Sequence, residues 1–290
     1  MKALLICPAA RSAFSLPGTR IPLANIPLLG QTLLEYWLSY LALRGAESVL
    51  VLTSDRPEEA EALVGSGARW GLEARVCAET QELTPEEARA KYFQEVNSSS
   101  PTPVIEILDH FPGFPRRLFG GYTEFYNALQ VWMSFALTPE RVGMREVSAR
   151  IWAGANSRIS LEAELHPPCW IGQHAVVGPR AIVGPGSIIE DGVVMEAAAG
   201  ISASWIGSYT FVGRLARINK SLAWGNRLVN WQTGSSTLVP DPFILSASWR
   251  PQTRNRRKWF RRLGELYSSH KSQGASPWQE LIVPGAGTDA

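Results

Sequence analysis

Four residues of the sequence have side chains that could take part in binding or catalysis. Arg11 and Arg20 lie in the loop that follows the first apolar segment, and Asp109 directly follows a later apolar segment. A guanidinium group stabilises a bound or developing anion, and a carboxylate can hold a metal ion. The fourth residue, His174, carries an imidazole that can serve as a general base. For each of the four, the simpler interpretation is a solvated loop or turn residue.

The composition is that of a folded protein of about two domains. Hydrophobic residues make up 45% of the 290 residues and charged residues 19%, which excludes an intrinsically disordered chain. The net charge of +2 excludes a protein that coats nucleic acid, and we expect no nucleic-acid partner. Eight Lys and Arg residues and a single Glu fall between Arg250 and Lys271, so the rest of the chain is slightly acidic.

The cysteines and the apolar segments indicate the compartment. Cys7, Cys77 and Cys169 lie far apart and form no C-x-x-C pair, which favours a reducing cytoplasm over a disulfide framework or a zinc site. The apolar start of the chain is too short for a signal peptide, and no stretch reaches the ~18 apolar residues of a membrane span. We expect a cytoplasmic protein that is at most peripheral to a membrane.

A six-residue period runs through the second half of the sequence. Every sixth residue from Ala153 to Ile201 is apolar, and after a slip of one residue the period resumes from Ile206 to Trp224. Neither an α-helix nor an alternating strand has this period, which is typical of a parallel β-helix. Because three hexapeptides make one coil, we expect roughly five coils between residues 147 and 240.

The period resembles that of the hexapeptide-repeat proteins, whose β-helix is left-handed. Some members of that family transfer acyl groups with a His between neighbouring subunits as general base, and His174 is the candidate here. Other members use the β-helix as a scaffold and oligomerisation module. The resemblance implies a homo-oligomer formed through the β-helix and leaves acyl transfer open as an alternative.

Strands and helices alternate in the first half of the chain. We expect strands at residues 3–7, 49–53, 74–78 and 104–108, and helices at residues 33–44, 56–64 and 85–95. This alternation predicts a parallel sheet that binds ligands at the carboxyl ends of its strands.

The order of these segments resembles the sugar-phosphate nucleotidyltransferase (NDP-sugar pyrophosphorylase) family. The first strand, a long loop, Pro27-Leu28-Leu29-Gly30 and Leu33-Leu34-Glu35-Tyr36 are similar to the opening of that family, and residues 65–72 are similar to its G-D-G-x-x-x-G-x stretch. The implied fold class is α/β plus β: a shortened Rossmann-like nucleotidyltransferase domain at 1–145, a left-handed parallel β-helix at 146–245, and a basic amphipathic tail at 246–290 that contains a C-terminal helix.

The resemblance also implies a reaction and a set of binding residues. The family joins a nucleoside triphosphate to a sugar 1-phosphate and releases pyrophosphate, in sugar-nucleotide and surface-polysaccharide metabolism. The nucleotide would contact Pro8, Ala9, Ala10, Arg11 and Gly67, and Mg²⁺ would bind Asp109. The partners expected on this basis are a nucleotide or a sugar phosphate.

The phosphate-handling residues of that family are replaced in this sequence. Pro8 and Ala9 stand for the paired glycines, Ala13 for the catalytic Arg, and Leu23 for a phosphate-binding Lys. Pro8 has no N–H to offer to a phosphate, and Ala13 has no charge. Arg11 or Arg20 could supply the missing cation only if the loop takes a different path.

The region that would hold the sugar is also shortened, because only eleven residues separate Asp109 from Gly121. Loss of that lobe removes the positioning on which phosphoryl transfer depends. We therefore expect a catalytically degenerate protein with a regulatory or scaffolding role. The alternatives are an active enzyme with a rebuilt site that uses Mg²⁺, a hexapeptide-repeat acyltransferase, or an assembly protein.

The basic tail is expected to contain an amphipathic helix at residues 250–271, followed by a loose end at 272–290. Its apolar positions Trp259, Phe260, Leu263 and Leu266 fall on one helical face. Such a helix caps the open end of a β-helix, or lies on an anionic membrane or a partner protein.

Overall fold

The structure, a computed structural model, describes residues 1–16, 21–97, 105–112, 114, 117–135, 143–248 and 280–282. The chain divides into two compact units. The first unit is Met1–Ser15 with Thr19–Trp132, and the second is Leu16–Gly18 with Met133–Ala290. The first unit therefore ends at Trp132, before the boundary expected at residue 145.

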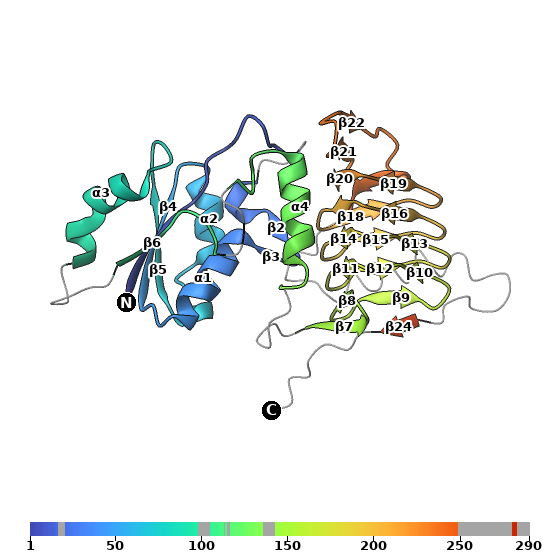
Figure 1. The fold of residues 1–290 in the computed structure, drawn as a ribbon, viewed down its shortest axis with the longest axis horizontal. Coiled ribbons are helices and arrows are strands. Elements are labelled where there is room, and N and C mark those ends of the chain that lie inside the picture. The colour runs from blue at the N-terminus through green and yellow to red at the C-terminus, as the bar shows by residue number, and fades with distance from the viewer. Residues whose placement is uncertain are drawn as a thin grey trace, which may run out of the picture. The chain divides into compact units, whose positions relative to one another are not determined.

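Four parallel strands form the sheet in the described part of the first unit (Figure 1). The strands are β1 (Lys2–Ile6), β4 (Ser48–Thr53), β5 (Glu73–Ala78) and β6 (Ile105–Leu108). Their spatial order is β5-β4-β1-β6, so the first strand of the chain pairs on both of its sides. The expected strands are confirmed to within one residue at each end, because buried parallel strands are continuous apolar runs.

The helices of the first unit begin at side-chain caps and at a proline. They are α1 (Leu33–Leu43), α2 (Pro57–Val64), α3 (Pro85–Asn97) and α4 (Tyr122–Trp132). Thr32 accepts a hydrogen bond from the Glu35 N–H while Glu35 accepts one from the Thr32 N–H, and Thr84 and Glu87 form the same capping box before α3. These caps fix where each helix leaves its preceding loop.

Short elements complete the first unit. They are η1 (Leu23–Asn25), η2 (Ala68–Trp70), and the antiparallel pair β2 (Pro27–Leu28) and β3 (Gln31–Thr32). Helix α3 packs against β1 and β6, and α2 packs against β5. Leu4, Ile6 and Leu52 of the sheet form one buried cluster with Ala88 and Tyr92 of α3.

The second unit is a parallel β-helix with strands stacked on three faces (Figure 1). One face consists of β8 (Ile151–Gly154), β11 (Cys169–Ile171), β14 (Ser187–Ile189), β17 (Trp205–Ile206) and β20 (Ser221–Trp224). The second face consists of β9 (Arg158–Ser160), β12 (Val176–Val177), β15 (Val194–Met195) and β18 (Thr210–Val212). The third consists of β10 (Glu164–Leu165), β13 (Ile182–Val183), β16 (Gly200–Ser202) and β19 (Arg217–Asn219). The left-handed sense stays a prediction.

The six-residue period corresponds to the interior of the β-helix. The residues at the expected positions belong to one apolar cluster, from Ala153 through Ile201 and again from Ile206 to Ile218, with Leu165 packed against it. The slip between Ile201 and Ile206 is thus confirmed. The expected interior position at Trp224 is wrong, because Ala223 pairs with Ile206 and faces the core while the Trp224 ring lies 5.5 Å from that of Trp205.

Close backbone contact explains the glycine that follows an interior residue. A Cβ added to Gly172 would lie 2.6 Å from the backbone nitrogen of Asp191 in the next coil, and one added to Gly154 would lie 2.4 Å from the backbone nitrogen of Gln173. Successive coils can therefore approach this closely only where no side chain stands between them.

Antiparallel strands lie along the edges of the stacked coils. β7 (Met144–Ser148) pairs with β8, β21 (Arg227–Asn230) with β20, β22 (Ser236–Leu238) with β21, β23 (Leu245–Ala247) with β18, and β24 (Glu280–Ile282) with β9. The described residues form four complete coils and only begin a fifth at β20. Roughly five coils were expected, and the fifth stays incomplete because the Gly225–Asn226 turn between the paired Trp224 and Arg227 reverses the chain.

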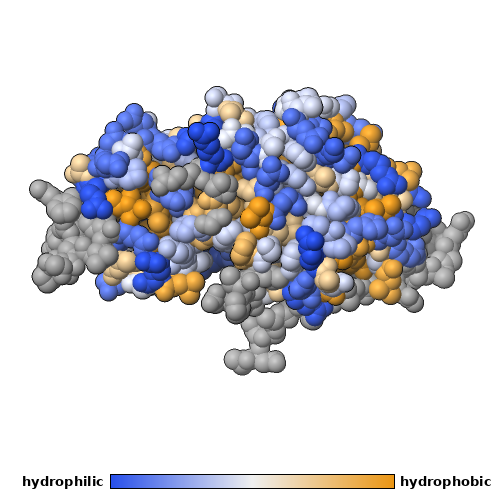
Figure 2. Space-filling model, in the orientation of Figure 1, coloured by the Kyte–Doolittle hydropathy of each residue, from blue (hydrophilic) through white to orange (hydrophobic). Residues whose placement is uncertain are grey.

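The tail is described at only a few positions. Residues 280–282 form the edge strand β24, which corrects the expectation that 272–290 is a loose end. The basic helix expected at 250–271 lies outside the described residues. Within the described ranges no helix combines the length and apolar character of a membrane span. Figure 2 shows hydrophilic and hydrophobic residues intermingled over the face in view.

Candidate functional site

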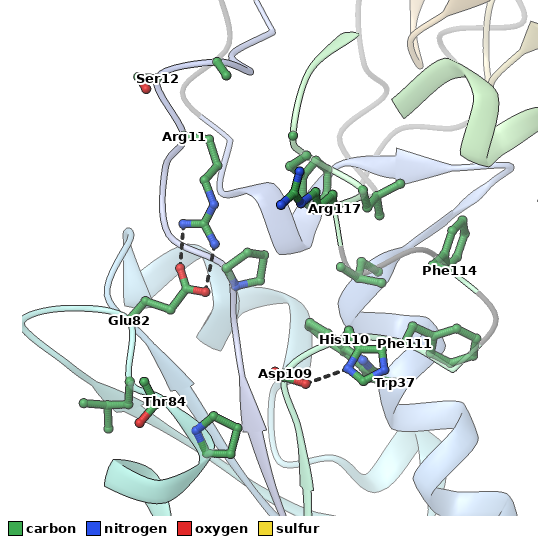
Figure 3. Close-up of a pocket in the computed structure, with 18 residues that line it drawn as sticks. Arg11, Ser12, Trp37, Glu82, Thr84, Asp109, His110, Phe111, Phe114 and Arg117 are labelled. Atoms are coloured by element: carbon green, nitrogen blue, oxygen red, sulfur yellow. Dashed lines mark hydrogen bonds and ion pairs between the residues drawn. The ribbon is translucent and has the colours of Figure 1, made fainter. Parts of the chain in front are cut away.

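A cavity of about 670 Å³ lies in the first unit. It is lined by the loop that follows β1, the segment between β5 and α3, the segment between β6 and α4, and the start of α1 (Figure 3). The three lining segments each follow a parallel strand, so the cavity lies at the carboxyl ends of the sheet, where open α/β sheets bind ligands. Its volume is in the range of small-molecule sites.

The Glu82 carboxylate is bound by the hydrogen-bond donors of the loop after β1 that could otherwise bind an anion. It accepts a hydrogen bond from the Ala9 N–H at 2.8 Å and two from Arg11, at 2.6 Å from Nη1 and 2.8 Å from Nη2 (Figure 3). Arg11 also donates to the Ala9 carbonyl at 3.1 Å. One backbone N–H and one bidentate guanidinium, the groups that would hold a phosphate oxygen, are thus both satisfied within the chain.

This contact affects the ionisation of its neighbours. The hydrogen bond to Glu82 raises the pKa of Arg11 against the opposing effect of burial, so Arg11 stays charged. Burial, with a smaller contribution from the charge of Glu82, raises the pKa of the Cys7 thiol to about 12. Cys7 is therefore a protonated, unreactive thiol at neutral pH.

The phosphate-loop residues expected from the sequence come only partly together. Pro8 and Arg11 line the cavity, Ala9 contributes its N–H to Glu82, and Ala10 is exposed. Gly67 does not line the cavity. It is the N-cap residue before η2, with a φ of +80°, and its carbonyl accepts hydrogen bonds from Trp70 and Leu72. Arg20 lies outside the described residues.

Sequence reasoning missed Glu82, which is 71 residues from Arg11 in the chain. No periodicity or motif marks it. The only available signal is its position, because it follows a predicted parallel strand and so lies at the same edge of the sheet as the loop after β1.

Asp109 lines the cavity as expected, but its carboxylate is paired with the next residue. Asp109 Oδ1 lies 2.6 Å from His110 Nδ1, and both side chains are about one-third exposed (Figure 3). Among the described residues no group of three or more His, Cys, Asp or Glu could hold a metal ion. Because Mg²⁺ is usually held by one or two carboxylates together with substrate phosphates, the Mg²⁺ site at Asp109 that the nucleotidyltransferase resemblance implies stays a prediction.

The wall of the cavity nearest α1 and α4 is aromatic. Phe111 and Phe114 lie 6.0 Å apart between ring centroids, and Trp37 and Phe119 also line the cavity. The buried Trp37 Nε1–H has no hydrogen-bond acceptor among the described residues. Arg117 lines the same cavity with an exposed guanidinium that pairs with no described residue.

His174 lies at a corner of the β-helix and does not line the cavity. It has a left-handed φ of +57°, its N–H donates to the Ala155 carbonyl at 3.0 Å, and the residue is half-buried. Asn156 adopts the same left-handed conformation at a neighbouring corner, as do several further residues of the coils. The position of His174 is thus one that the turn geometry of the repeat accounts for.

The chain matches no protein-family model and no curated protein. Among solved structures it is similar to the acetyltransferase domain of PglB from Neisseria gonorrhoeae FA1090, at 14% identity and a TM-score of 0.15, over 59% of this chain and 79% of that one. The structure of that domain in complex with acetyl coenzyme A gives the same identity and TM-score, over 60% and 80% of the two chains. The class of protein defined by the coordinates is an α/β unit joined to a parallel β-helix.

Proposed function

We propose that the protein is a catalytically degenerate member of the sugar-phosphate nucleotidyltransferase group with a regulatory or scaffolding role. The strand order β5-β4-β1-β6 is compatible with a shortened Rossmann-like domain, in which a ligand binds at the carboxyl ends of the strands. The cavity lies at that edge of the sheet. Its role is then to bind a nucleotide or sugar phosphate, or a related small ligand, rather than to convert one.

The single observation that carries the proposal is the binding of Glu82 by the loop after β1. A phosphate that used the Ala9 N–H and Arg11 would have to displace this carboxylate or share one cation with it. Two like charges 4 Å apart repel by about 4 kcal/mol at an effective dielectric constant of 20. The Thr84–Glu87 capping box fixes the start of α3 two residues after Glu82.

The absence of catalytic groups in the loop points the same way. Pro8 has no N–H, Ala13 lines the cavity with a methyl group, and Asp109 is paired with His110. A triphosphate bound here would meet no charge to neutralise the leaving pyrophosphate at Ala13.

The β-helix supports the scaffolding part of the proposal. Its coils present long parallel faces on which a second copy of the chain can pack, and we propose that the protein is a homo-oligomer through this unit. Size-exclusion chromatography with light scattering gives the mass, and a monomer at micromolar concentration would contradict this part alone.

The catalytic part is tested by incubating the protein with each nucleoside triphosphate, a panel of sugar 1-phosphates and Mg²⁺, and measuring pyrophosphate. We expect no release above that of a blank without protein. Glu82→Gln is the matched variant, because it removes the charge that competes with phosphate and should raise nucleotide binding without restoring turnover. Turnover by the wild type above ~1 s⁻¹, ordinary for an enzyme, would overturn the proposal.

A further inference from the structure

We propose that the aromatic end of the cavity binds an aromatic anion, a flat ring that carries a carboxylate or a phosphate. The anion lies at Arg117, and the ring packs against Phe111, Phe114 and the neighbouring apolar wall. This inference names the ligand class of the regulatory site and so rests on the proposed function for its biological meaning. Its physical basis is a different set of residues from the loop that holds Glu82.

The charges of the cavity single out Arg117. Arg11 is bound by Glu82, and Asp109 is paired with His110. Arg117 is the one charged lining residue without a partner in the part of the chain that the structure describes. Its guanidinium presents a planar set of donors that matches a carboxylate or a phosphate with two parallel hydrogen bonds.

The wall beside Arg117 is suited to a flat apolar body. Phe111 and Phe114 are edge-on to one another, with ring planes at 62°, and Leu118 and Phe119 continue the same wall. Aromatic rings gain about 0.5–1.5 kcal/mol from offset or edge-to-face contact beyond the area that they bury. Each of these four side chains is at most 8% exposed, so a ring in the cavity would cover the small apolar area that they leave open there.

In the described part of the chain, the lining also contains a buried donor without an acceptor. Trp37 is completely buried and lines the cavity, yet its indole N–H has no acceptor among the described residues. A buried donor without an acceptor costs about 1–3 kcal/mol. The Nε1 atom is enclosed by protein, as are the unsatisfied indole nitrogens of Trp152 and Trp170 in the other unit, so the ligand class is assigned from Arg117 and the apolar lining alone.

The test is calorimetric titration of the intact protein with phenyl phosphate, benzoate and 4-hydroxybenzoate. Inorganic phosphate and acetate are controls that carry the anion without the ring, and phenol is the control that carries the ring without the anion. We expect at least one aromatic anion to bind ten-fold or more tightly than its inorganic or aliphatic counterpart and than phenol. The phosphate and carboxylate probes separate the two sources of the anion.

Variants identify the residues. Arg117→Gln should weaken binding of the aromatic anions by about ten-fold or more, as loss of a charge-assisted pair predicts. The control Arg180→Gln removes an exposed arginine of the other unit and should change nothing. Because Arg117 is exposed, its replacement should leave the melting temperature unchanged, so a loss of binding in Arg117→Gln would not be a loss of folding.

Three outcomes would overturn the assignment. They are no binding of any aromatic anion, equal affinity for phenyl phosphate and inorganic phosphate, and unchanged affinity in Arg117→Gln. A large gain of affinity in Glu82→Gln would also overturn it, because the anion would then be at Arg11. None of these results bears on pyrophosphate release. If the ligand assignment fails, the proposal of a catalytically degenerate protein is still tested separately by the pyrophosphate assay.

Discussion

The Glu82–Arg11 contact is the interaction whose removal should be most informative. Glu82→Gln keeps the shape of the side chain but removes its charge and leaves it unable to accept hydrogen bonds at both ends. The wild-type carboxylate accepts three, and the side chains of Arg11 and Glu82 are 39% and 31% exposed. The contribution of this contact to stability should therefore lie between that of an exposed ion pair, about 0.2–1 kcal/mol, and that of a buried charge-assisted hydrogen bond, about 1.5–3 kcal/mol.

We expect Glu82→Gln to lower the free energy of unfolding by about 1–2 kcal/mol. Urea denaturation, followed by circular dichroism, measures the difference at low and high salt. Because water and ions reach both side chains, about half of the effect should disappear at 1 M NaCl. Glu106→Gln is the matched control, since Glu106 forms a single contact with the exposed Arg44 and should cost less than about 1 kcal/mol.

Two results would refute this reasoning. The first is that Glu82→Gln and the wild type have the same stability to within about 0.3 kcal/mol, a typical error of such comparisons. The three hydrogen bonds would then make no net contribution to stability. An equal loss in Glu82→Gln and Glu106→Gln would mean that the loop contact is no stronger than a surface ion pair. Either result would also remove the argument that a phosphate has to compete with Glu82.

Three further predictions concern other parts of the chain. Burial alone would raise the pKa of Glu79, but hydrogen bonds from Lys91 and Tyr92 outweigh burial and lower it. The Glu79 carboxylate therefore stabilises the fold above about pH 4.5, and this stabilisation is lost as the pH falls. In urea titrations, the wild type should lose more stability than Glu79→Gln between pH 5 and pH 3. Gly172→Ala should cost about 1–3 kcal/mol in denaturant, because the added methyl meets the backbone of the next coil; an unchanged midpoint would contradict the close approach. His174→Ala should change no acyl-CoA-dependent activity, and loss of such an activity in a transfer assay would restore the acyltransferase alternative.

The β-helix could be predicted from the sequence because its information is local and repeated. Each face of a coil contributes an interior residue to the same apolar core, so the interior positions from Ala153 to Ile218 recur every six residues and the sequence repeats once per face. Its end could not be predicted in the same way. The Gly225–Asn226 turn makes the chain fold back after Trp224, and an apolar residue there satisfied the period although it faces away from the core.

The alternation of the first unit was also predicted, because buried parallel strands and capped helices are each encoded in short segments. The candidate site could be predicted only in part. The sequence pointed to Arg11 and Asp109, whereas their partners Glu82 and His110 decide what they can do. The Arg11–Glu82 pair depends on the loops that follow β1 and β5, and the pairing of loops 71 residues apart leaves no periodic trace in the sequence.

The antiparallel strands at the edges of the β-helix have a consequence for self-association. A parallel coil ends in a row of unpaired backbone donors and acceptors that the coil of another molecule could continue, and this is how fibrils grow. β7, β21 and β24 cover such rows with strands of opposite direction, which do not repeat the coil. On the two faces that carry these strands, end-to-end stacking of coils from different molecules into a filament is therefore disfavoured.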